Sequence, residues 1–176
     1  MSLEKTKPTD YMRTVQDYPV EGVNFYDVNS LFASDLWTSE VKDIAKRIQE
    51  SIEYMPTHIV GIESRGFVLG AALSQELNIP FVMVRKKGAK YPGKLLEESY
   101  ELEYGTDTLT LQEGILGHTS RVLIADDLVA TGGSMNASKR LCEQTGAIVL
   151  GGVTIVNLKY LNGEEMELLS SVEIEQ

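Results

Sequence analysis

The segment of the chain with the clearest chemical potential spans residues 122–135 and reads VLIADDLVATGGSM. An apolar run leads directly into two carboxylates, Asp126 and Asp127, which can accept hydrogen bonds from the vicinal hydroxyl groups of a sugar. Glycines let the main chain approach a phosphate closely, and N–H groups, hydroxyls and a helix dipole can then surround the anion. The residues that would do so are Ala130, Thr131, Gly132, Gly133 and Ser134. We interpret the segment as a sugar-phosphate site; the alternative is an acidic turn before an ordinary helix N-cap.

The pattern of apolar residues predicts the elements that must position this site. Short buried strands are expected at 58–62, 80–84, 121–125 and 147–158, and a half-exposed strand at 107–112. Helices are expected at 38–52, 66–77 and 133–146. Strands that alternate with helices and are apolar almost throughout indicate an α/β fold, with a mostly parallel central sheet and helices on both faces. In such folds ligands bind at the carboxyl ends of the strands, where the two aspartates fall.

Length and composition limit the classes of protein that need to be considered. A chain of 176 residues is most simply one domain, residues 1–176, and 43% hydrophobic residues are ordinary for a globular protein. The net charge of −10 argues against binding to nucleic acid or to an anionic membrane surface. The single cysteine, Cys142, excludes an internal disulfide and fits a reducing compartment. With neither a signal sequence nor an apolar stretch long enough to span a bilayer, we expect a cytoplasmic protein.

The segment 122–135 resembles the phosphoribosyl-pyrophosphate (PRPP) signature of the type I phosphoribosyltransferases. In this family two acidic residues hold the ribose hydroxyls and the following loop wraps the 5-phosphate. Four further segments resemble the adenine-specific branch of the family in the right order: YPVEGVNFYDV (18–28), VGIESRGFVLGAAL (60–73), VRKKGAKYPG (84–93) and SYELEYG (99–105). The resemblance covers nearly the whole chain. It implies a Rossmann-like sheet, an N-terminal hood at about residues 1–35 and a flexible catalytic lid at about residues 86–107.

Two groups of residues are expected to bind pyrophosphate. Ser64 and Arg65 lie at a predicted strand-to-helix turn, where a guanidinium can form paired hydrogen bonds with pyrophosphate oxygens. Arg85, Lys86 and Lys90 belong to the strongest basic cluster of an acidic chain, and such a patch would complement a pyrophosphate leaving group. The alternatives are a surface arginine near a helix cap and a solvated basic face. The resemblance implies that both groups bind pyrophosphate, partly across the interface of a homodimer.

The lid segment carries two residues for which the resemblance implies a catalytic part, together with Arg65. Glu103 is the implied acid or base near the purine, and Tyr104 would cover the site. Residues 85–105 also show no regular pattern, and an unpatterned segment of this length with glycine and proline is usually functional or disordered. The alternative is an exposed acidic loop.

The implied purine site consists of Asn24, Phe25 and Leu158, with the base stacked on Phe25. Two features depart from the family pattern. Tyr26 stands where the hood usually carries an arginine, and GAKYPG has one residue more than the usual loop. Phosphoribosyl transfer to another purine (hypoxanthine, guanine or xanthine) therefore stays open as an alternative to adenine.

The implied reaction is the transfer of phosphoribose from PRPP to adenine, giving AMP and pyrophosphate in purine salvage. It requires orientation of two reactants and stabilisation of charge rather than a strong protein nucleophile. Mg²⁺ would be held mainly by PRPP oxygens, so we expect no metal site made by the protein alone. A different class, a PRPP-sensing regulator without turnover, is disfavoured because Glu103 and Tyr104 are kept and no basic DNA-binding module is added.

Overall fold

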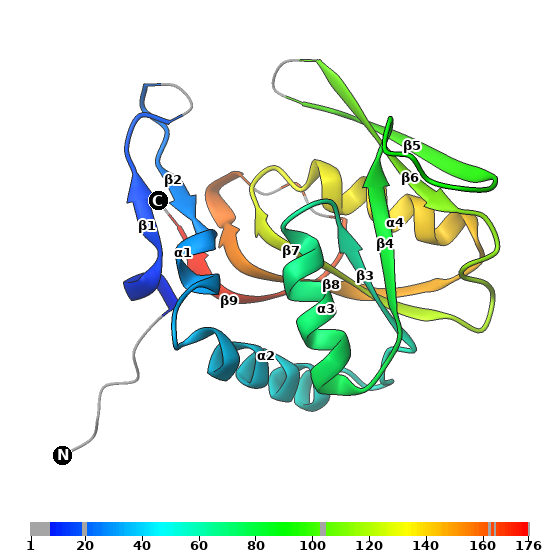
Figure 1. Cartoon of the computed structure of the whole chain (residues 1–176), viewed down its shortest axis with the longest axis horizontal. Helices are drawn as coiled ribbons and strands as arrows, with labels where there is room; N and C mark the ends of the chain where they lie inside the picture. The colour runs from blue at the N-terminus through cyan, green and yellow to red at the C-terminus, as the bar shows by residue number, and fades with distance from the viewer. Residues whose placement is uncertain (1–7, 19–20, 103–104, 162, 164, 176) are drawn as a thin grey trace.

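The computed structural model describes residues 8–18, 21–102, 105–161, 163 and 165–175. Within these ranges the central feature is a seven-stranded sheet with the strand order β5-β6-β4-β3-β7-β8-β9 (Figure 1). Its strands are β3 (His58–Ile62), β4 (Phe81–Lys86), β5 (Leu95–Glu101), β6 (Thr106–Gln112), β7 (Arg121–Val129), β8 (Ile148–Leu158) and β9 (Leu168–Ile174). The helices that pack on it are α2 (Trp37–Ser51), α3 (Gly66–Leu77) and α4 (Gly133–Gln144).

The pairing of the strands makes the sheet mostly parallel. Strand β3 lies between β4 and β7 and is parallel to both, and β8 and β9 continue the parallel sheet on the far side of β7. Strand β6 pairs with β4 and β5 in the antiparallel sense. The expected α/β fold is confirmed, and the carboxyl ends of β3, β4 and β7 meet at one edge of the sheet.

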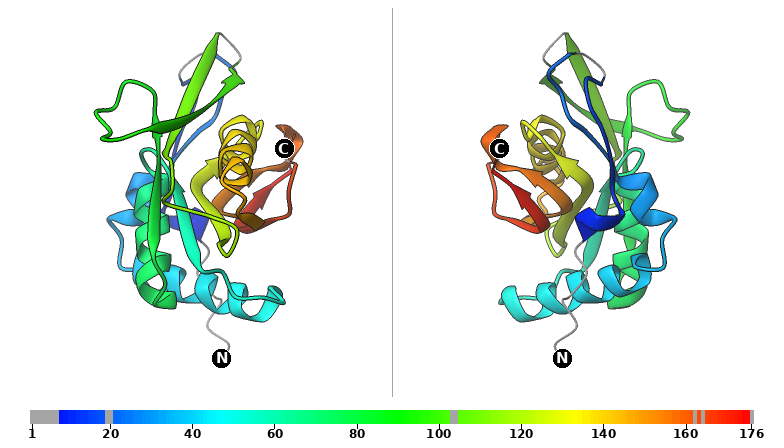
Figure 2. Two further views of the ribbon diagram at one scale, coloured as in Figure 1. Left: turned by 90° about the vertical axis from the view of Figure 1, so that its right-hand side faces the viewer. Right: turned by 90° about the vertical axis from the view of Figure 1, so that its left-hand side faces the viewer.

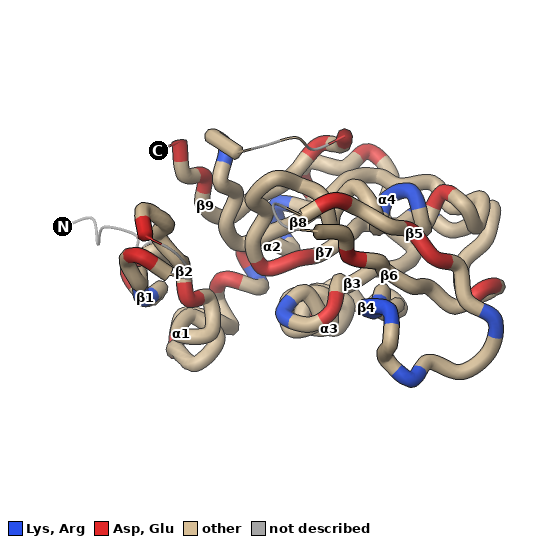
Figure 3. Tube along the Cα trace, turned by 90° about the horizontal axis from the view of Figure 1, so that it is seen from above, with Lys and Arg blue, Asp and Glu red and all other residues tan. Residues whose placement is uncertain are grey.

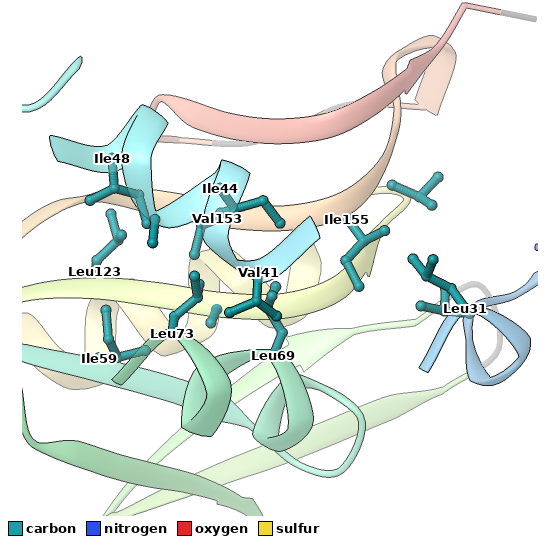
Figure 4. Packing of buried hydrophobic residues seen from close by; sticks show 14 of the residues in the cluster. Leu31, Val41, Ile44, Ile48, Ile59, Leu69, Leu73, Leu123, Val153 and Ile155 are labelled. Atoms are coloured by element: carbon teal, nitrogen blue, oxygen red, sulfur yellow. The ribbon is translucent and has the colours of Figure 1, made fainter. Parts of the chain in front are cut away.

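Side chains along each central strand alternate between two apolar layers, one on each face of the sheet. Ile59 and Leu123 belong to the layer that contains α2 and α3, whereas Val60 and Ile124 belong to the layer that contains α4. Figure 2 shows these helices on opposite sides of the sheet. Labelled side chains of the first layer in Figure 4 include Ile44, Ile48, Leu69, Leu73, Leu123 and Val153. Because both faces are covered, the central strands are apolar almost throughout.

The helices expected from the sequence are confirmed to within two residues at each end, and each expected strand is present. Strand β7 continues four residues past its expected end, because it still pairs with β8 at Asp126 and Leu128. The expectation that 107–112 is half exposed was wrong at Thr110, which is buried between β5 and β4 and whose hydroxyl donates to the Arg85 carbonyl oxygen.

Strands β5 and β6 form a long arm that projects beyond the rest of the sheet (Figure 1). Strand β5 was not predicted, since glutamates interrupt its apolar pattern. Its inward-facing Glu98 accepts hydrogen bonds from Arg140 Nε at 2.6 Å and from Gln144 Nε2 at 2.9 Å, both on α4. The arm is therefore fastened to the helix that begins at the glycine-rich loop.

The N-terminal segment forms a two-stranded hairpin, β1 (Arg13–Val15) and β2 (Phe25–Asp27), between the short 3₁₀ helix η1 (Pro8–Tyr11) and α1 (Val28–Phe32). Asp27 ends the hairpin in two ways: its side chain accepts a hydrogen bond from the Asn29 N–H and pairs with Arg13 at 2.9 Å. The hairpin stands beside the carboxyl end of the sheet (Figure 1). Phe25 is thereby carried toward the strand tips.

Candidate active site

The carboxyl ends of β3, β4 and β7 surround a cleft of about 500 Å³. Its lining comes from residues 62–65, Lys86, Tyr100, residues 126–128 and Ser134. Seen from above, the acidic segment of β7 lies near the middle of the molecule, and β3 separates it from the basic end of β4 (Figure 3). Four segments that are separated in the sequence (62–65, 86, 100 and 126–134) thus meet at the edge where the fold predicts a ligand.

The two aspartates lie on neighbouring positions of β7; Asp127 is buried and Asp126 is half-buried. Asp126 Oδ1 accepts a hydrogen bond from the Asp127 N–H at 3.0 Å, and Asp126 Oδ2 accepts one from Ser134 Oγ at 3.4 Å. Burial and the neighbouring charge of Asp127 raise the pKa of Asp126 well above its usual value. Burial also raises the pKa of Asp127, although the charge of Arg65 opposes the shift. Hydroxyl donors from a sugar would satisfy these carboxylates.

Arg65 is positioned by unusually close packing at the start of α3. Gly66 follows it, and a Cβ there would lie 2.7 Å from the Ala125 carbonyl oxygen, so only glycine lets α3 begin against the tip of β7. Arg65 Nε lies 2.8 Å from Asp127 Oδ2, although its N–H is not aimed at that oxygen, which receives no hydrogen bond. The side chain is 46% exposed, leaving the guanidinium open to an anion.

The glycine-rich loop lines an adjoining pocket of about 170 Å³ that opens beneath the β5–β6 arm. Gly132 has a φ of +81°, a left-handed conformation that glycine adopts without strain, and it caps the N-terminus of α4. A Cβ on Gly133 would lie 3.1 Å from Tyr100 Cδ2, so the arm packs directly on the loop. The whole predicted loop, Ala130, Thr131, Gly132, Gly133 and Ser134, belongs to the lining of this pocket. Main-chain N–H groups at the start of α4 can bind a phosphate there.

The predicted basic cluster divides between the cleft and the surface. Lys86 lines the cleft together with Ser64 and Arg65. Arg85, its neighbour on β4, turns instead to Glu63, at 3.3 Å, and to the ring of Tyr91. Lys90 contributes its carbonyl oxygen to Arg85 Nη1 at 3.5 Å and, like Arg85, does not line the cleft. Basic positions on the loop after β4 lie at the periphery in Figure 3.

The predicted purine residues lie on the side of the cleft nearest the N-terminal hairpin. Phe25 directly follows Asn24, and the guanidinium carbon of Arg65 lies 5.8 Å from its ring centre. The ring of Tyr18 packs edge-on against Phe25, with the two ring centres 5.2 Å apart. Leu158 ends β8 in the apolar cluster that also holds Tyr26 and Leu128. Glu103 and Tyr104 lie outside the described residues.

Sequence reasoning missed Glu63, Tyr100 and Asp107. Glu63 follows β3 directly, and its place at the end of a buried strand was a usable signal; the peptide bond after it is cis. Tyr100 and Asp107 face each other across β5 and β6, and the Tyr100 hydroxyl donates to Asp107 Oδ2 at 3.3 Å. Nothing local in the sequence indicates this contact, because it depends on the register of an arm that was not predicted.

The described part of the chain has neither a cluster of metal-ligating side chains nor a membrane-spanning helix. No group of three or more His, Cys, Asp or Glu side chains there could hold a metal ion. None of its helices combines the length and the apolar character needed to cross a membrane.

A mostly parallel sheet whose strand tips carry an aspartate pair, a glycine-rich phosphate loop and facing basic side chains is the arrangement of a phosphoribosyltransferase. Residues 27–167 match the model of the phosphoribosyl transferase domain family, and the chain belongs to that family. Among curated proteins, adenine phosphoribosyltransferase of Rhodospirillum rubrum is 45% identical over 157 residues, which cover 89% of this chain and 90% of the relative. The protein of the same name from Brachyspira hyodysenteriae is 45% identical over 158 residues, covering 89% and 90%.

Solved structures agree with this placement. Adenine phosphoribosyltransferase from Thermoanaerobacter pseudethanolicus superimposes with a TM-score of 0.86 at 32% identity, covering 94% of this chain and 96% of that one. The Saccharomyces cerevisiae protein, solved with adenine and an imino-altritol bisphosphate, gives 0.83 at 33% identity and covers 92% and 94%. The similarity in sequence and in structure therefore extends over nearly the whole chain.

Proposed function

We propose that this chain is an adenine phosphoribosyltransferase, which transfers phosphoribose from PRPP to adenine and releases AMP and pyrophosphate. The observation that carries the proposal is the cleft with its adjoining pocket: Asp126, Asp127, Arg65 and Lys86 line the cleft, and the glycine-rich loop that follows the aspartates lines the pocket. These groups match the three parts of PRPP: a diol, a phosphate monoester and a pyrophosphate. The choice of adenine rests on the relatives and on the aromatic hood residue Phe25.

Each part of the cleft then has one task in the reaction. Asp126 and Asp127 accept hydrogen bonds from the ribose hydroxyls, and the loop 130–134 binds the 5-phosphate with main-chain N–H groups and hydroxyls. Arg65 and Lys86, with Ser64, neutralise the departing pyrophosphate. Positive charge that develops on the ribose ring faces the aspartates. Catalysis therefore comes from orientation and from charges placed in advance.

A divalent cation fits this arrangement if the substrate carries it. Asp127 lies beside Arg65, Asp126 accepts a hydrogen bond from Ser134, and no group of three or more such ligands occurs among the described residues, which therefore offer single oxygens rather than a cage. We propose that Mg²⁺ is held mainly by PRPP oxygens, with Asp126 and Asp127 nearby. When bound, it would neutralise charge on the pyrophosphate group.

The remaining assignments rest on the family resemblance. Glu103 would handle a proton of the purine, and Tyr104 would cover the site as the lid, residues 86–107, closes over both substrates. Asn24, Phe25 and Leu158 would hold the base. Arg85 and Lys90 lie outside the cleft of their own subunit and would contribute across the interface of a homodimer. We further propose that the chain acts as a single domain in the cytoplasm.

Steady-state turnover with PRPP, Mg²⁺ and a panel of bases tests the proposal. Adenine should give AMP and pyrophosphate in equal amounts, and hypoxanthine, guanine and xanthine should give far less nucleotide. Efficient formation of IMP, GMP or XMP would reassign the base. If the protein bound PRPP but formed no nucleotide from any base, the proposal of an enzyme would be wrong, and a PRPP-binding regulator would take its place.

A further inference from the structure

Lys86 is held by an ion pair that no step of the proposed reaction uses. Its Nζ lies 3.2 Å from Oδ2 of Asp107, a residue of β6 that does not belong to the cleft lining. The main-chain N–H of Lys86 donates to Glu63 Oε2 at 2.9 Å, so the base of the side chain is fixed while its tip is steered by Asp107. The ammonium that faces the cleft therefore already has an anionic partner before any ligand arrives.

Asp107 is equipped to remain a carboxylate. Burial acts to raise its pKa, but the hydrogen bond from the Thr108 N–H and the contact with Lys86 outweigh burial and hold the pKa below its usual value. Tyr100 donates to the same oxygen as Lys86, at 3.3 Å. Burial, with the charges of Asp107 and Asp126, raises the pKa of Tyr100 to about 12, so its hydroxyl keeps the proton that it donates. Asp107 Oδ2 thus has two partners, the hydroxyl of Tyr100 and the ammonium of Lys86, and only the ammonium is free to move.

We propose that Asp107 competes with the pyrophosphate group for Lys86 and thereby limits how tightly the cleft holds pyrophosphate. The inference rests on the proposed function, in which Lys86 binds pyrophosphate. When the anion arrives, the Lys86 ammonium leaves Asp107 for the phosphate oxygens; when it departs, Asp107 takes the ammonium back. The side chains of Lys86 and Asp107 are 54% and 26% exposed, and exposed ion pairs are weak enough for such an exchange.

The sign of the effect follows from two contributions. The Lys86–Asp107 pair must be broken before the ammonium can serve pyrophosphate, and the Asp107 carboxylate also repels the incoming anion. Both weaken pyrophosphate binding, and an enzyme that must release pyrophosphate in every turnover benefits from weak product binding. A residue that merely positioned Lys86 would have the opposite effect, because its loss would free the ammonium to rotate away.

Calorimetric titration of Mg²⁺-pyrophosphate into the wild type and Asp107→Asn tests the inference. Asn keeps the size of the side chain and can still accept from Tyr100. We expect Kd to fall by about two- to fivefold, the range for an exposed ion pair, and the difference to shrink as salt is added. Glu97→Gln is the matched control. It removes the same charge from the same arm by breaking the exposed pair with Lys87, at 2.8 Å, and should leave Kd unchanged.

Two further variants separate competition from a general disturbance. Tyr100→Phe removes a donor from Asp107, strengthens its hold on Lys86 and should raise Kd, opposite to Asp107→Asn. In a Lys86→Met background, Asp107→Asn should no longer tighten binding. Unchanged or weaker binding by Asp107→Asn, or tightening that persists without Lys86, would overturn the inference. Wild-type turnover of adenine and PRPP, measured in parallel, separates that failure from failure of the proposed function.

Discussion

Replacing Gly66 with alanine tests whether the packing of α3 on the tip of β7 positions the cleft. A Cβ at residue 66 would lie 2.7 Å from the Ala125 carbonyl oxygen and 3.0 Å from Asp126 Oδ1, against an ordinary contact of at least 3.4 Å. Since the nearest atom belongs to the main chain, the start of α3 must move by about 0.7 Å, and Arg65 moves with it. Such overpacking costs about 1–3 kcal/mol of folding free energy. A displacement near 1 Å costs about tenfold to hundredfold in kcat/KM.

Urea unfolding and steady-state kinetics with PRPP and adenine measure the two effects of Gly66→Ala. Gly70→Ala is the matched control on the same helix: its Cβ would lie 2.7 Å from a ring carbon of Phe81, a side chain that does not line the cleft. It should lose stability but keep the wild-type kcat/KM per folded molecule. If Gly66→Ala retained wild-type kcat/KM, the close approach of α3 to β7 would have no part in positioning Arg65.

Four other predictions concern the site. The double variant Asp126→Asn with Asp127→Asn should lose turnover but keep its fold, because both side chains lie at a strand tip outside the apolar layers; near-normal turnover would remove the ribose-binding role. The folding stability of the double variant should also depend less on pH than that of the wild type. Burial raises both native pKa values, so the unfolded chain loses these protons first, and wild-type stability falls as pH rises from about 4 through the native values. Thermal unfolding measured across this pH range should show that the melting temperature of the double variant falls less with rising pH than that of the wild type. Glu103→Ala and Glu103→Gln should both lower kcat more than they raise KM if Glu103 handles a proton, whereas recovery of the rate by Gln would limit it to hydrogen bonding. Light scattering should show a homodimer, and a fully active monomer at every dilution would contradict the shared pyrophosphate site.

The parts of the site that are contiguous in the chain could be predicted from the sequence. Residues 126–134 place acids, glycines and hydroxyls directly after a buried strand, and that order alone specifies where they lie in an α/β sheet. The central helices and strands could be predicted equally well, because the spacing of apolar residues in each is typical of its type of secondary structure. The local sequence was enough to predict a site residue wherever the helix or strand that contains the residue also orients it.

Contacts between distant segments could not be predicted in this way. Whether a lysine near the end of β4 enters the cleft depends on Glu63, which follows β3, and on Asp107, which belongs to β6. Strand β5 was hidden for a related reason: Glu98 faces inward, which its charge argues against, and only its partners on α4 explain how the charge is accommodated. The position of Lys86 and the formation of β5 both depend on contacts between side chains of different elements. The spacing of apolar residues along the sequence does not indicate such contacts.

The attachment of the β5–β6 arm to α4 also restricts how this protein can be recombined with its relatives. Arg140 and Gln144 hold Glu98 from the same helix whose first turn follows the glycine-rich loop. A chimera that received only a foreign arm would keep the strand register but would leave Arg140 facing whatever residue replaced Glu98. Exchange of the arm together with α4 would transfer both sides of the contact. Functional transplants between homologues should therefore be cut after residue 144 rather than at the end of β6.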